Sequence, residues 1–303
     1  MLVLVLGVDV GGTATKTVLV DDAGAVLEVR SRPTPRPGPE IVPEVLDLVA
    51  ELACELPSDH VGVAVPGIVD EPRGVGVFSK NLGWQDVPFA DLLADRLCRP
   101  VAFTHDVRAG ALAEHALGGG VGARTMLFLP IGTGIASALV TDGRVHDADG
   151  YAGELGHVDV GHGEPCPCGG TGCLEVVASA SAIARRYTAR TGREVGGAVD
   201  VARRVEAGER AAVSVWDEAV EGLVTALAWT AGVLAPEVVV VGGGLSGAKG
   251  LLLKPLTEGL SARLTFQRTP RLAPAVLGGL AGCRGAALTA IATQSQVPGR
   301  RAG

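Results

Sequence analysis

The first part of the chain alternates between apolar, strand-like runs and short polar turns. Residues 2–10 form a continuous apolar run, which is typical of a strand buried on both faces of a sheet. A glycine turn at 11–16 leads to a second strand at 17–20, and the sequence Asp-Asp-Ala-Gly then turns the chain into a third strand at 25–29. The pattern predicts that the chain begins in a β-sheet.

Helical spacing of apolar residues first occurs at 41–56. A strand at 61–65 then ends at a Pro-Gly pair, and a short helix around 92–97 precedes the next strand, at 101–104. A helix is predicted directly afterwards, over 107–117. Strands and helices therefore alternate, as they do in α/β proteins.

The second half repeats this order. Strand patterns are found at 125–130 and 135–141, and helical spacing fills most of 178–234. A strand at 238–241 precedes the sequence GGGLSG, which opens another helix, and a last helix is predicted over 282–292. The repetition indicates two related α/β domains that face one another across a cleft.

Glycines clustered after residue 117 supply the junction between the two domains. We expect an N-terminal α/β domain at 1–118, completed by the C-terminal helix 282–293, and a C-terminal α/β domain at 119–281. The tail, 294–303, is polar and is expected to be disordered.

Composition supports a folded protein of this size. The chain has 303 residues, of which 47% are hydrophobic and 19% charged, so it can bury a sizeable core. Its formal net charge is -7, with 26 Lys and Arg against 33 Asp and Glu. This balance gives no electrostatic reason to expect nucleic acid or an anionic membrane as a partner.

The apolar start lacks a basic leader and is too short to cross a bilayer, so we interpret it as a buried strand. Six cysteines are present, three of them scattered singly and three crowded into one short segment. That distribution differs from a disulfide framework and favours a reducing compartment, the cytoplasm, with one metal site.

Three glycine clusters stand where predicted strands end, a position suited to binding phosphate. Gly11 and Gly12 let backbone amides approach an anion, and Thr13 adds a hydroxyl donor. Asp9, at the end of the first strand, is suited to hold a divalent cation through water. The other two clusters are Gly132-Thr133-Gly134 and Gly242-Gly243-Gly244.

Any one of these clusters is also compatible with an ordinary turn. The Walker A sequence is absent, since no GKS or GKT follows a cluster, and the first and last clusters lack the G-x-G-x-x-G order of a Rossmann dinucleotide site. Three clusters together predict a nucleotide held between two domains.

Asp106 follows the apolar strand at 101–104 and precedes a helix. Its simplest role there is that of a helix N-cap. A carboxylate at the carboxyl end of a strand also lies where open α/β sheets bind ligands, and it can accept the proton of an attacking hydroxyl. Both interpretations are open at the level of the residue.

The strongest chemical signal is a histidine followed by three cysteines. His157 stands in the sequence Gly-Glu-Leu-Gly-His, and Cys166, Cys168 and Cys173 follow among glycines that let the backbone wrap a small ion. One His and three Cys form the ligand set of a closed tetrahedral zinc site. Four protein ligands leave no open position, so structural zinc is favoured over catalytic zinc.

Together these segments resemble the ROK family, which contains bacterial glucokinases, other hexose and amino-sugar kinases, and sugar-responsive repressors. The most specific part is the pattern E-x-G-H, C-x-C-G and G-C-L-E between Glu154 and Glu175. The D-x-G-G-T at Asp9, the Pro66-Gly67 turn, the segment 81–84 and the GGGLS at 242–246 stand in the expected order.

The resemblance implies an α/β, two-lobed, actin- and hexokinase-like (ribonuclease H-like) fold with an active-site cleft between the lobes. It implies an ATP-dependent kinase that phosphorylates a hydroxyl of a hexose or an N-acetylhexosamine, with Asp106 as the catalytic base. The implied sugar contacts are Gly67, Asn81, His105, Asp106, Glu154, His157 and Glu175. The implied contacts to ATP are Asp9, Gly11, Gly12, Thr13, Gly132, Thr133, Gly134, Gly243 and Gly244.

The same resemblance implies Mg²⁺ with ATP, a structural Zn²⁺ held by His157, Cys166, Cys168 and Cys173, and a homodimer or higher homo-oligomer. One ring nitrogen of His157 would bind zinc and the other the sugar, so that the metal fixes the orientation of a substrate contact.

This chain departs from the family beside the base, where the usual Asn-Asp-Ala-Asn is replaced by His105-Asp106-Val107-Arg108. A neutral His has one ring donor and one acceptor, so His105 replaces only part of the sugar contact that Asn makes. Arg108 can face an anion, a neighbouring carboxylate or solvent, and the sequence leaves these three open. The departure bears on which sugar is used more than on the chemistry.

Two other functions compete with that of a kinase. A transcriptional regulator of the same family would carry a helix-turn-helix module before the sugar-binding part, and here the phosphate turn begins at Asp9. A sugar sensor without catalysis is suggested by His105 and Arg108, whereas the intact Asp9 and Asp106 favour an enzyme.

Overall fold

The computed structural model describes residues 3–295, and the chain divides into two compact units. Unit 1 consists of the described residues up to Ala113, the segment Asp147–Ala152 and the described residues from Gly279 onward. Unit 2 consists of Glu114–His146 and Gly153–Gly278. Of the tail predicted to be disordered, residues 294 and 295 end the last helix, and 296–303 lie outside the described range.

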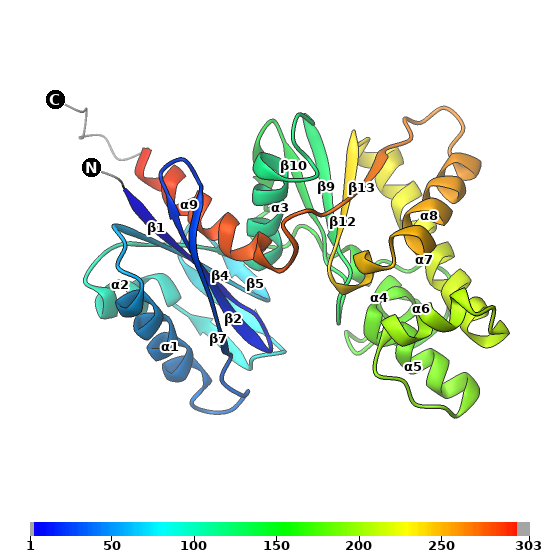
Figure 1. Ribbon diagram of the computed structural model, residues 1–303, viewed down its shortest axis with the longest axis horizontal. Helices are drawn as coiled ribbons and strands as arrows, with labels where there is room; N and C mark the ends of the chain where they lie inside the picture. The colour runs from blue at the N-terminus through cyan, green and yellow to red at the C-terminus, as the bar shows by residue number, and fades with distance from the viewer. Residues whose placement is uncertain (1–2, 296–303) are drawn as a thin grey trace. The chain divides into compact units, whose positions relative to one another are not determined.

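A five-stranded sheet with the order β3-β2-β1-β4-β8 forms the framework of unit 1 (Figure 1). Its strands are β1 (Leu4–Val10), β2 (Ala14–Asp21), β3 (Val26–Pro33), β4 (His60–Val65) and β8 (Val101–His105). β1, β4 and β8 are parallel, whereas β2 and β3 pair antiparallel with their neighbours. The carboxyl ends of the three parallel strands therefore share one edge of the sheet.

Helices cover both faces of this sheet. α1 (Ile41–Glu55) and α2 (Phe89–Leu97) pack on one face, where their apolar residues join those of β1, β4 and β8 in a buried core. α9 (Ala281–Ser295) packs on the opposite face. A small sheet of β5 (Ile68–Asp70), β6 (Val75–Ser79) and β7 (Trp84–Val87) lies between β4 and α2 in the sequence.

Glycines on the central strands allow α9 to approach the sheet closely. A Cβ atom on Gly7 would lie 1.9 Å from the carbonyl oxygen of Cys283, and one on Gly62 would lie 1.9 Å from that of Ala286. Both distances are far shorter than any real contact, so only glycine is compatible with this packing.

Unit 2 is built on a second five-stranded sheet, with the order β11-β10-β9-β12-β13. Its strands are β9 (Thr125–Pro130), β10 (Ala138–Thr141), β11 (Arg144–His146), β12 (Val238–Gly242) and β13 (Arg271–Pro274). β9, β12 and β13 are parallel, and β10 pairs antiparallel with β9. As in unit 1, parallel strands end together at one edge of the sheet.

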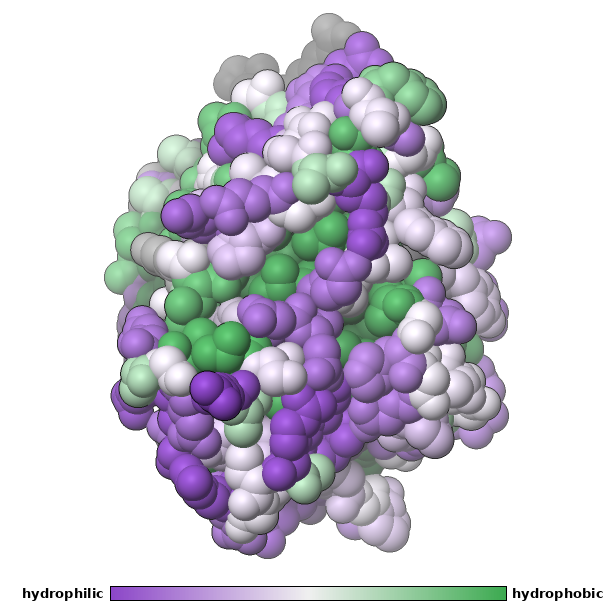
Figure 2. All heavy atoms as spheres, turned by 90° about the vertical axis from the view of Figure 1, so that its right-hand side faces the viewer, coloured by the Kyte–Doolittle hydropathy of each residue, from purple (hydrophilic) through white to green (hydrophobic). Residues whose placement is uncertain are grey.

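Helices make up most of the rest of unit 2. They are α4 (Leu174–Ala178), α5 (Ala180–Thr191), α6 (Ala198–Glu206), α7 (Arg210–Leu234) and α8 (Lys249–Arg263), with short 3-10 turns η1 (Leu155–His157), η2 (Gly244–Gly247) and η3 (Gly278–Leu280, which extends into unit 1). α3 (Asp106–Leu117) begins in unit 1, and the division between the units falls within it, after Ala113. Figure 2 shows one side of the molecule, where apolar patches alternate with bands of polar side chains.

Most predicted elements are confirmed, including the strands at 2–10 and 101–104 and the helices at 41–56 and 107–117. The strand predicted at 135–141 is shorter and begins only at Ala138, because residues 132–135 form a glycine turn closed by a bridge between Ile131 and Ile135. The small sheet of unit 1 and β13 were not predicted. In the described part of the chain, no helix is long and apolar enough to cross a membrane.

Candidate active site

Two aspartates lie at the carboxyl edge of the unit 1 sheet. Asp9 is the penultimate residue of β1, and Asp106 follows the last residue of β8 as the first residue of α3. Burial raises the pKa of Asp9 to about 7, with a further increase from the negative charge of Asp106 and an opposing effect of Lys16. The two carboxylates are therefore close enough to influence each other, as a phosphoryl-transfer site with a cation requires.

The surroundings of Asp106 make its carboxylate more basic than that of an exposed aspartate. Burial raises its pKa to about 6, while the Val107 amide and the charge of Arg108 act in the opposite direction. Its Oδ1 accepts a hydrogen bond from the Val107 backbone N–H at 2.7 Å. A carboxylate with this pKa is ionised at neutral pH and is more basic than an exposed one, which suits it to accept a hydroxyl proton.

Arg108 faces a carboxylate, which is one of the three partners that the sequence left open. Its guanidinium is 3% exposed, and its Nε donates to Oε1 of Glu71 at 2.6 Å. Its two terminal nitrogens donate to the carbonyl oxygens of Val69, at 3.0 Å, and Gly150, at 3.4 Å. Each guanidinium nitrogen of Arg108 thus has a partner inside unit 1, and the buried side chain is not exposed to an anion in solution.

Glu71 was missed by sequence reasoning. Besides Arg108, its Oε1 accepts hydrogen bonds from Thr104 Oγ1 at 3.0 Å and from the His105 backbone N–H at 3.1 Å. An isolated Glu after a short strand carries no signal of such a role. The basic residue two positions after Asp106 was the only indication in the sequence of a nearby carboxylate.

The first glycine turn has an open backbone at the same sheet edge. Gly12 and Thr13 are exposed, and the turn is closed by the Gly11 N–H, which donates to the carbonyl of Ala14 at 3.2 Å. The Thr34 hydroxyl donates to the Gly11 carbonyl at 2.7 Å and so attaches the turn to the residue that follows β3. The exposed part of the turn is therefore free to receive a phosphate.

Two further predicted sugar contacts of unit 1 lie beyond β4 and within the small sheet. Gly67 has a φ of +109°, and a Cβ there would lie 2.2 Å from the Phe78 carbonyl oxygen, so the position requires glycine. Asn81 is exposed in the turn between β6 and β7.

The two glycine clusters of unit 2 lie side by side. Gly132–Gly134 follows β9 and Gly242–Gly244 ends and follows β12, and these two strands are parallel neighbours. The Ile131 N–H donates to the Gly242 carbonyl at 2.9 Å, and the Ile131 carbonyl accepts from Leu245 N–H at 3.1 Å. The structure thus brings together two clusters that are more than a hundred residues apart in the sequence.

Glu175 joins this edge of unit 2. It lies in α4, and its Oε2 accepts a hydrogen bond from the Ile135 N–H at 2.9 Å. A Cβ on Gly134 would lie 2.5 Å from the same oxygen, so the glycine makes room for the carboxylate. A predicted sugar contact and a predicted phosphate turn are therefore immediate neighbours.

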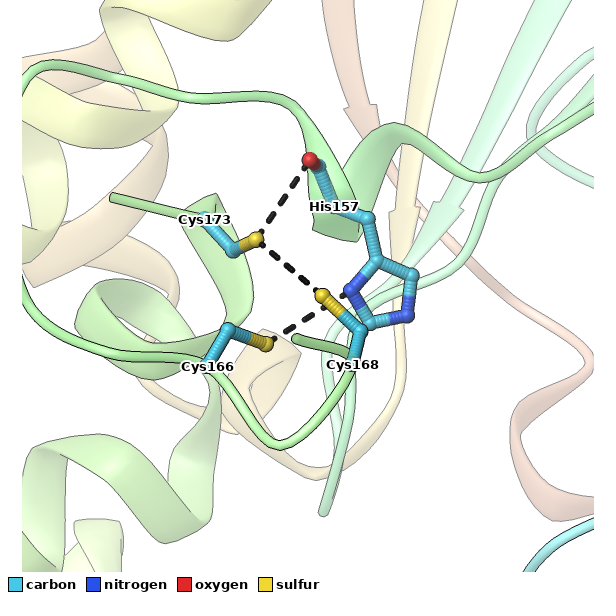
Figure 3. A group of neighbouring side chains, drawn as sticks. All are labelled: His157, Cys166, Cys168 and Cys173. Carbon is cyan, nitrogen blue, oxygen red and sulfur yellow. Dashed lines mark hydrogen bonds between the residues drawn. The ribbon is translucent and has the colours of Figure 1, made fainter. Parts of the chain in front are cut away.

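His157 and the three cysteines form a compact cluster (Figure 3). Their ligand atoms all lie within 4.8 Å of one another. His157 Nδ1 is 3.8 Å from Cys166 Sγ, and the sulfurs of Cys168 and Cys173 are 3.7 Å apart. A tetrahedron with metal–sulfur bonds of about 2.3 Å has edges of about 3.8 Å, so the spacing fits zinc.

The electrostatics of the cluster also fit a cation. Burial and the neighbouring thiols Cys166 and Cys168 raise the pKa of Cys173 to about 12, while the Gly170 N–H lowers the pKa of Cys168. Crowded thiols resist ionising together, and a divalent cation removes that resistance by binding the thiolates.

The two ring nitrogens of His157 face different neighbours. Nδ1 faces the sulfurs, whereas Nε2 lies 3.9 Å from Oε2 of Glu154. Both side chains are more than a third exposed, at 37% for His157 and 55% for Glu154. The nitrogen turned away from the cysteines is thus on the same side as an accessible carboxylate.

Two α/β units, each with glycine turns at the carboxyl edge of a mixed sheet, define the two-lobed actin-like class of folds. The chain belongs to the ROK family, whose sequence profile matches residues 5–293.

The chain is 35% identical to a glucokinase of Halalkalibacterium halodurans, with 85% of each chain covered. It is 32% identical to an N-acetylmannosamine kinase of Citrobacter koseri over 82% of this chain and 85% of the relative. The crystal structure of a ROK glucokinase from Streptomyces griseus, in complex with glucose and AMPPNP, superposes with a TM-score of 0.81. It is 28% identical and covers 95% of this chain and 99% of its own.

Proposed function

We propose that this chain is an ATP-dependent sugar kinase, which transfers the γ-phosphoryl group of ATP to a hydroxyl of a hexose or an N-acetylhexosamine. The observation that carries the proposal is Asp106, a carboxylate with a pKa of about 6 at the carboxyl edge of a sheet that also presents Asp9 and a phosphate-type turn. The kinship with glucokinase and N-acetylmannosamine kinase supports it and fixes the substrate class.

In this proposal Asp106 accepts the proton of the attacking hydroxyl. The sugar oxygen then bonds to the γ-phosphorus as the bond from that phosphorus to the bridging oxygen breaks, and ADP leaves with the electron pair. Gly67 and Asn81 of unit 1 and Glu154, His157 and Glu175 of unit 2 bind the sugar.

The phosphates and nucleoside of ATP are assigned to the glycine turns. In unit 1 these are Gly11, Gly12 and Thr13; in unit 2 they are Gly132, Thr133, Gly134, Gly243 and Gly244. Exposed turn amides at strand ends support this assignment, because they can donate to phosphate oxygens without a side chain intervening. Mg²⁺, held through Asp9, would neutralise charge on the phosphates.

We assign a structural Zn²⁺ to His157, Cys166, Cys168 and Cys173. The set of one nitrogen and three sulfur donors, and its spacing, are those of a closed tetrahedral site. The ion would fix the ring of His157 and, through it, the direction of Nε2.

Location and assembly are further parts of the proposal. Six cysteines without a disulfide, all within the described residues, suit a cytoplasmic protein. A homodimer or higher homo-oligomer follows from the family resemblance. Trp229 and Val233, one turn apart on α7 and 64% and 82% exposed, offer an apolar surface for it.

The proposal is tested by incubating the purified protein with Mg-ATP and a panel of hexoses and N-acetylhexosamines, with ADP release and phosphosugar formation as readouts. At least one sugar should be phosphorylated. In the variant Asp106→Asn, kcat should fall by about 10²- to 10⁴-fold, while the sugar Kd changes little, because only the proton acceptor is lost. The exposed Asp91 of α2 provides a matched control as Asp91→Asn, which should retain activity. Near-normal turnover in Asp106→Asn would refute the assignment.

A further inference from the structure

The turn at which Asp106 leaves the sheet is held by one oxygen of Glu71. This oxygen, Oε1, accepts hydrogen bonds from Thr104 Oγ1, at 3.0 Å, and from the His105 backbone N–H, at 3.1 Å. Thr104 and His105 are the last two residues of β8, and Asp106 follows directly as the first residue of α3. Glu71 therefore fixes the backbone from which the Asp106 side chain projects.

Arg108 binds the same oxygen from the helix side of this turn. It lies in the first turn of α3, its side chain is 3% exposed, and its Nε donates to Oε1 of Glu71 at 2.6 Å. Hydrogen bonds between charged groups are shorter and stronger than those between neutral groups. The last residues of β8 and the first turn of α3 thus share one acceptor, which ties the strand to the helix on both sides of Asp106.

The other donors of Arg108 reach two further segments of unit 1. One terminal nitrogen donates to the carbonyl of Val69 in β5, at 3.0 Å, and the other to that of Gly150, at 3.4 Å. β5 begins directly after Gly67, which is one of the proposed sugar contacts. The planar guanidinium therefore fixes the turn that carries Asp106 against the segment that follows Gly67. A lysine lacks the fork of donors that makes these contacts at once.

We propose that Glu71 and Arg108 are a pair of positioning residues, which hold the turn between β8 and α3 so that Asp106 is directed at the sugar hydroxyl. This rests on the proposed kinase function and gives a role to two residues outside the implied contacts to sugar and ATP. A buried ion pair adds little stability compared with apolar packing of the same volume, so the property that this pair supplies is fixed geometry.

Steady-state kinetics of variants on a sugar that the wild-type protein phosphorylates tests this role. Arg108→Gln and Glu71→Ala should each lower kcat on the order of tenfold, with the KM values for sugar and ATP changed by less than about threefold, because the base is misdirected while the binding groups remain. The combined variant should lose about as much kcat as either alone, since the two residues act as one unit. Glu71→Gln keeps an oxygen acceptor and should retain most of kcat. Arg73→Gln, at an exposed arginine of the same unit, is the control and should leave kcat unchanged.

Thermal unfolding of each variant separates this role from a structural one. A pair that only stabilises unit 1 would lower the unfolding midpoint and leave kcat of the folded protein unchanged. That result, a loss confined to KM, or additive losses of kcat in the combined variant overturns the inference while the kinase function stands. A wild-type protein that phosphorylates no sugar overturns the kinase function itself, and this inference with it. If Arg108→Gln does not fold, Arg108→Lys, which keeps the charge and loses the fork, should still lose kcat with KM unchanged, and normal turnover there overturns the inference.

Discussion

At the scale of single residues, the two aspartates of unit 1 differ in their surroundings although both lie at the carboxyl ends of parallel strands. Asp106 has an amide, a histidine and a nearby arginine around it, whereas the pKa of Asp9 is raised by burial and by Asp106 itself. The more basic Asp9 is the one that a cation would bind, since a positive charge offsets both effects. In the proposed mechanism, Asp106 then remains as the carboxylate that exchanges protons with a substrate.

This difference predicts the pH dependence of turnover. Asp106 must be ionised to accept a proton, and its pKa is raised from 3.8 to about 6. We expect kcat, measured at saturating sugar and Mg-ATP, to be constant above pH 7 and to fall about tenfold per pH unit below pH 6. Because Asp9 and Asp106 interact, the fall of kcat at low pH reflects the titration of both carboxylates when Mg²⁺ is not saturating. A rate that stays flat down to pH 4.5 would contradict this.

Arg108 and Glu71 mark the limit of prediction from sequence at this scale. Asp106 could be singled out because a strand and a helix meet there and because the family motif surrounds it. The partner of Arg108 lies 37 positions away, on a turn whose only signal is its polarity. Pairing at such a distance is decided by how β5 packs beside β8, and no local pattern encodes that.

At the scale of elements, the cysteine loop is held by its own backbone as well as by its ligands. The Cys166 N–H donates to the Gly170 carbonyl at 2.9 Å, and Val160 N–H donates to the Gly172 carbonyl at 2.8 Å. Gly172 has a φ of +77°, and a Cβ there would lie 2.0 Å from Asp159 Oδ1, so the loop depends on glycine at that point. The loop is shaped to bring its sulfurs to His157.

Metal removal tests this element. We expect about one zinc per chain by elemental analysis, and Cys166→Ser or treatment with a strong chelator should remove it. The sugar KM should then rise roughly 10- to 100-fold, because His157 and its neighbours lose their fixed orientation. Cys54→Ser and Cys98→Ser, at exposed cysteines outside the cluster, are the controls and should keep both metal and affinity. Protein without metal that binds sugar normally would defeat the zinc assignment.

The elements that sequence reasoning missed share a physical cause. β5, β6 and β7 have three to five residues each and alternate with turns, so they contain too few positions for a strand period to be recognised. β13, Arg271–Pro274, ends in proline and lies at a sheet edge, which weakens its signal further. Longer elements such as α1 and β1 were predicted to within a few residues because packing and pattern agree there.

At the scale of the whole molecule, unit 1 depends on segments from distant parts of the sequence. Its sheet comes from the first part of the chain, and α9 from the end covers one of the two faces. The close approach of α9 rests on small residues, since even a methyl group on Gly7 or Gly62 has no space.

Gly62→Ala should therefore destabilise the protein although it adds only one methyl group. The new Cβ would meet the Ala286 carbonyl oxygen at 1.9 Å, so α9 or β4 must shift, at a cost of about 1–3 kcal/mol. The measurement is the midpoint of urea or thermal unfolding. Gly232→Ala on α7, where a Cβ meets nothing within 4 Å, is the control and should be neutral or stabilising. Equal stability of the two variants would show that the tight packing of α9 is not required.

The position of α9 has a consequence for biosynthesis. Val5, Val18 and Val20 are covered by Cys283 and Ala287 of α9, which are translated some 280 residues later than the first of these valines. During synthesis, the N-terminal sheet thus emerges from the ribosome with one apolar face uncovered. That face remains exposed to solvent until almost the entire polypeptide has been made. We expect nascent chains to need chaperone protection throughout that interval, and truncated products that stop before α9 to aggregate or be degraded.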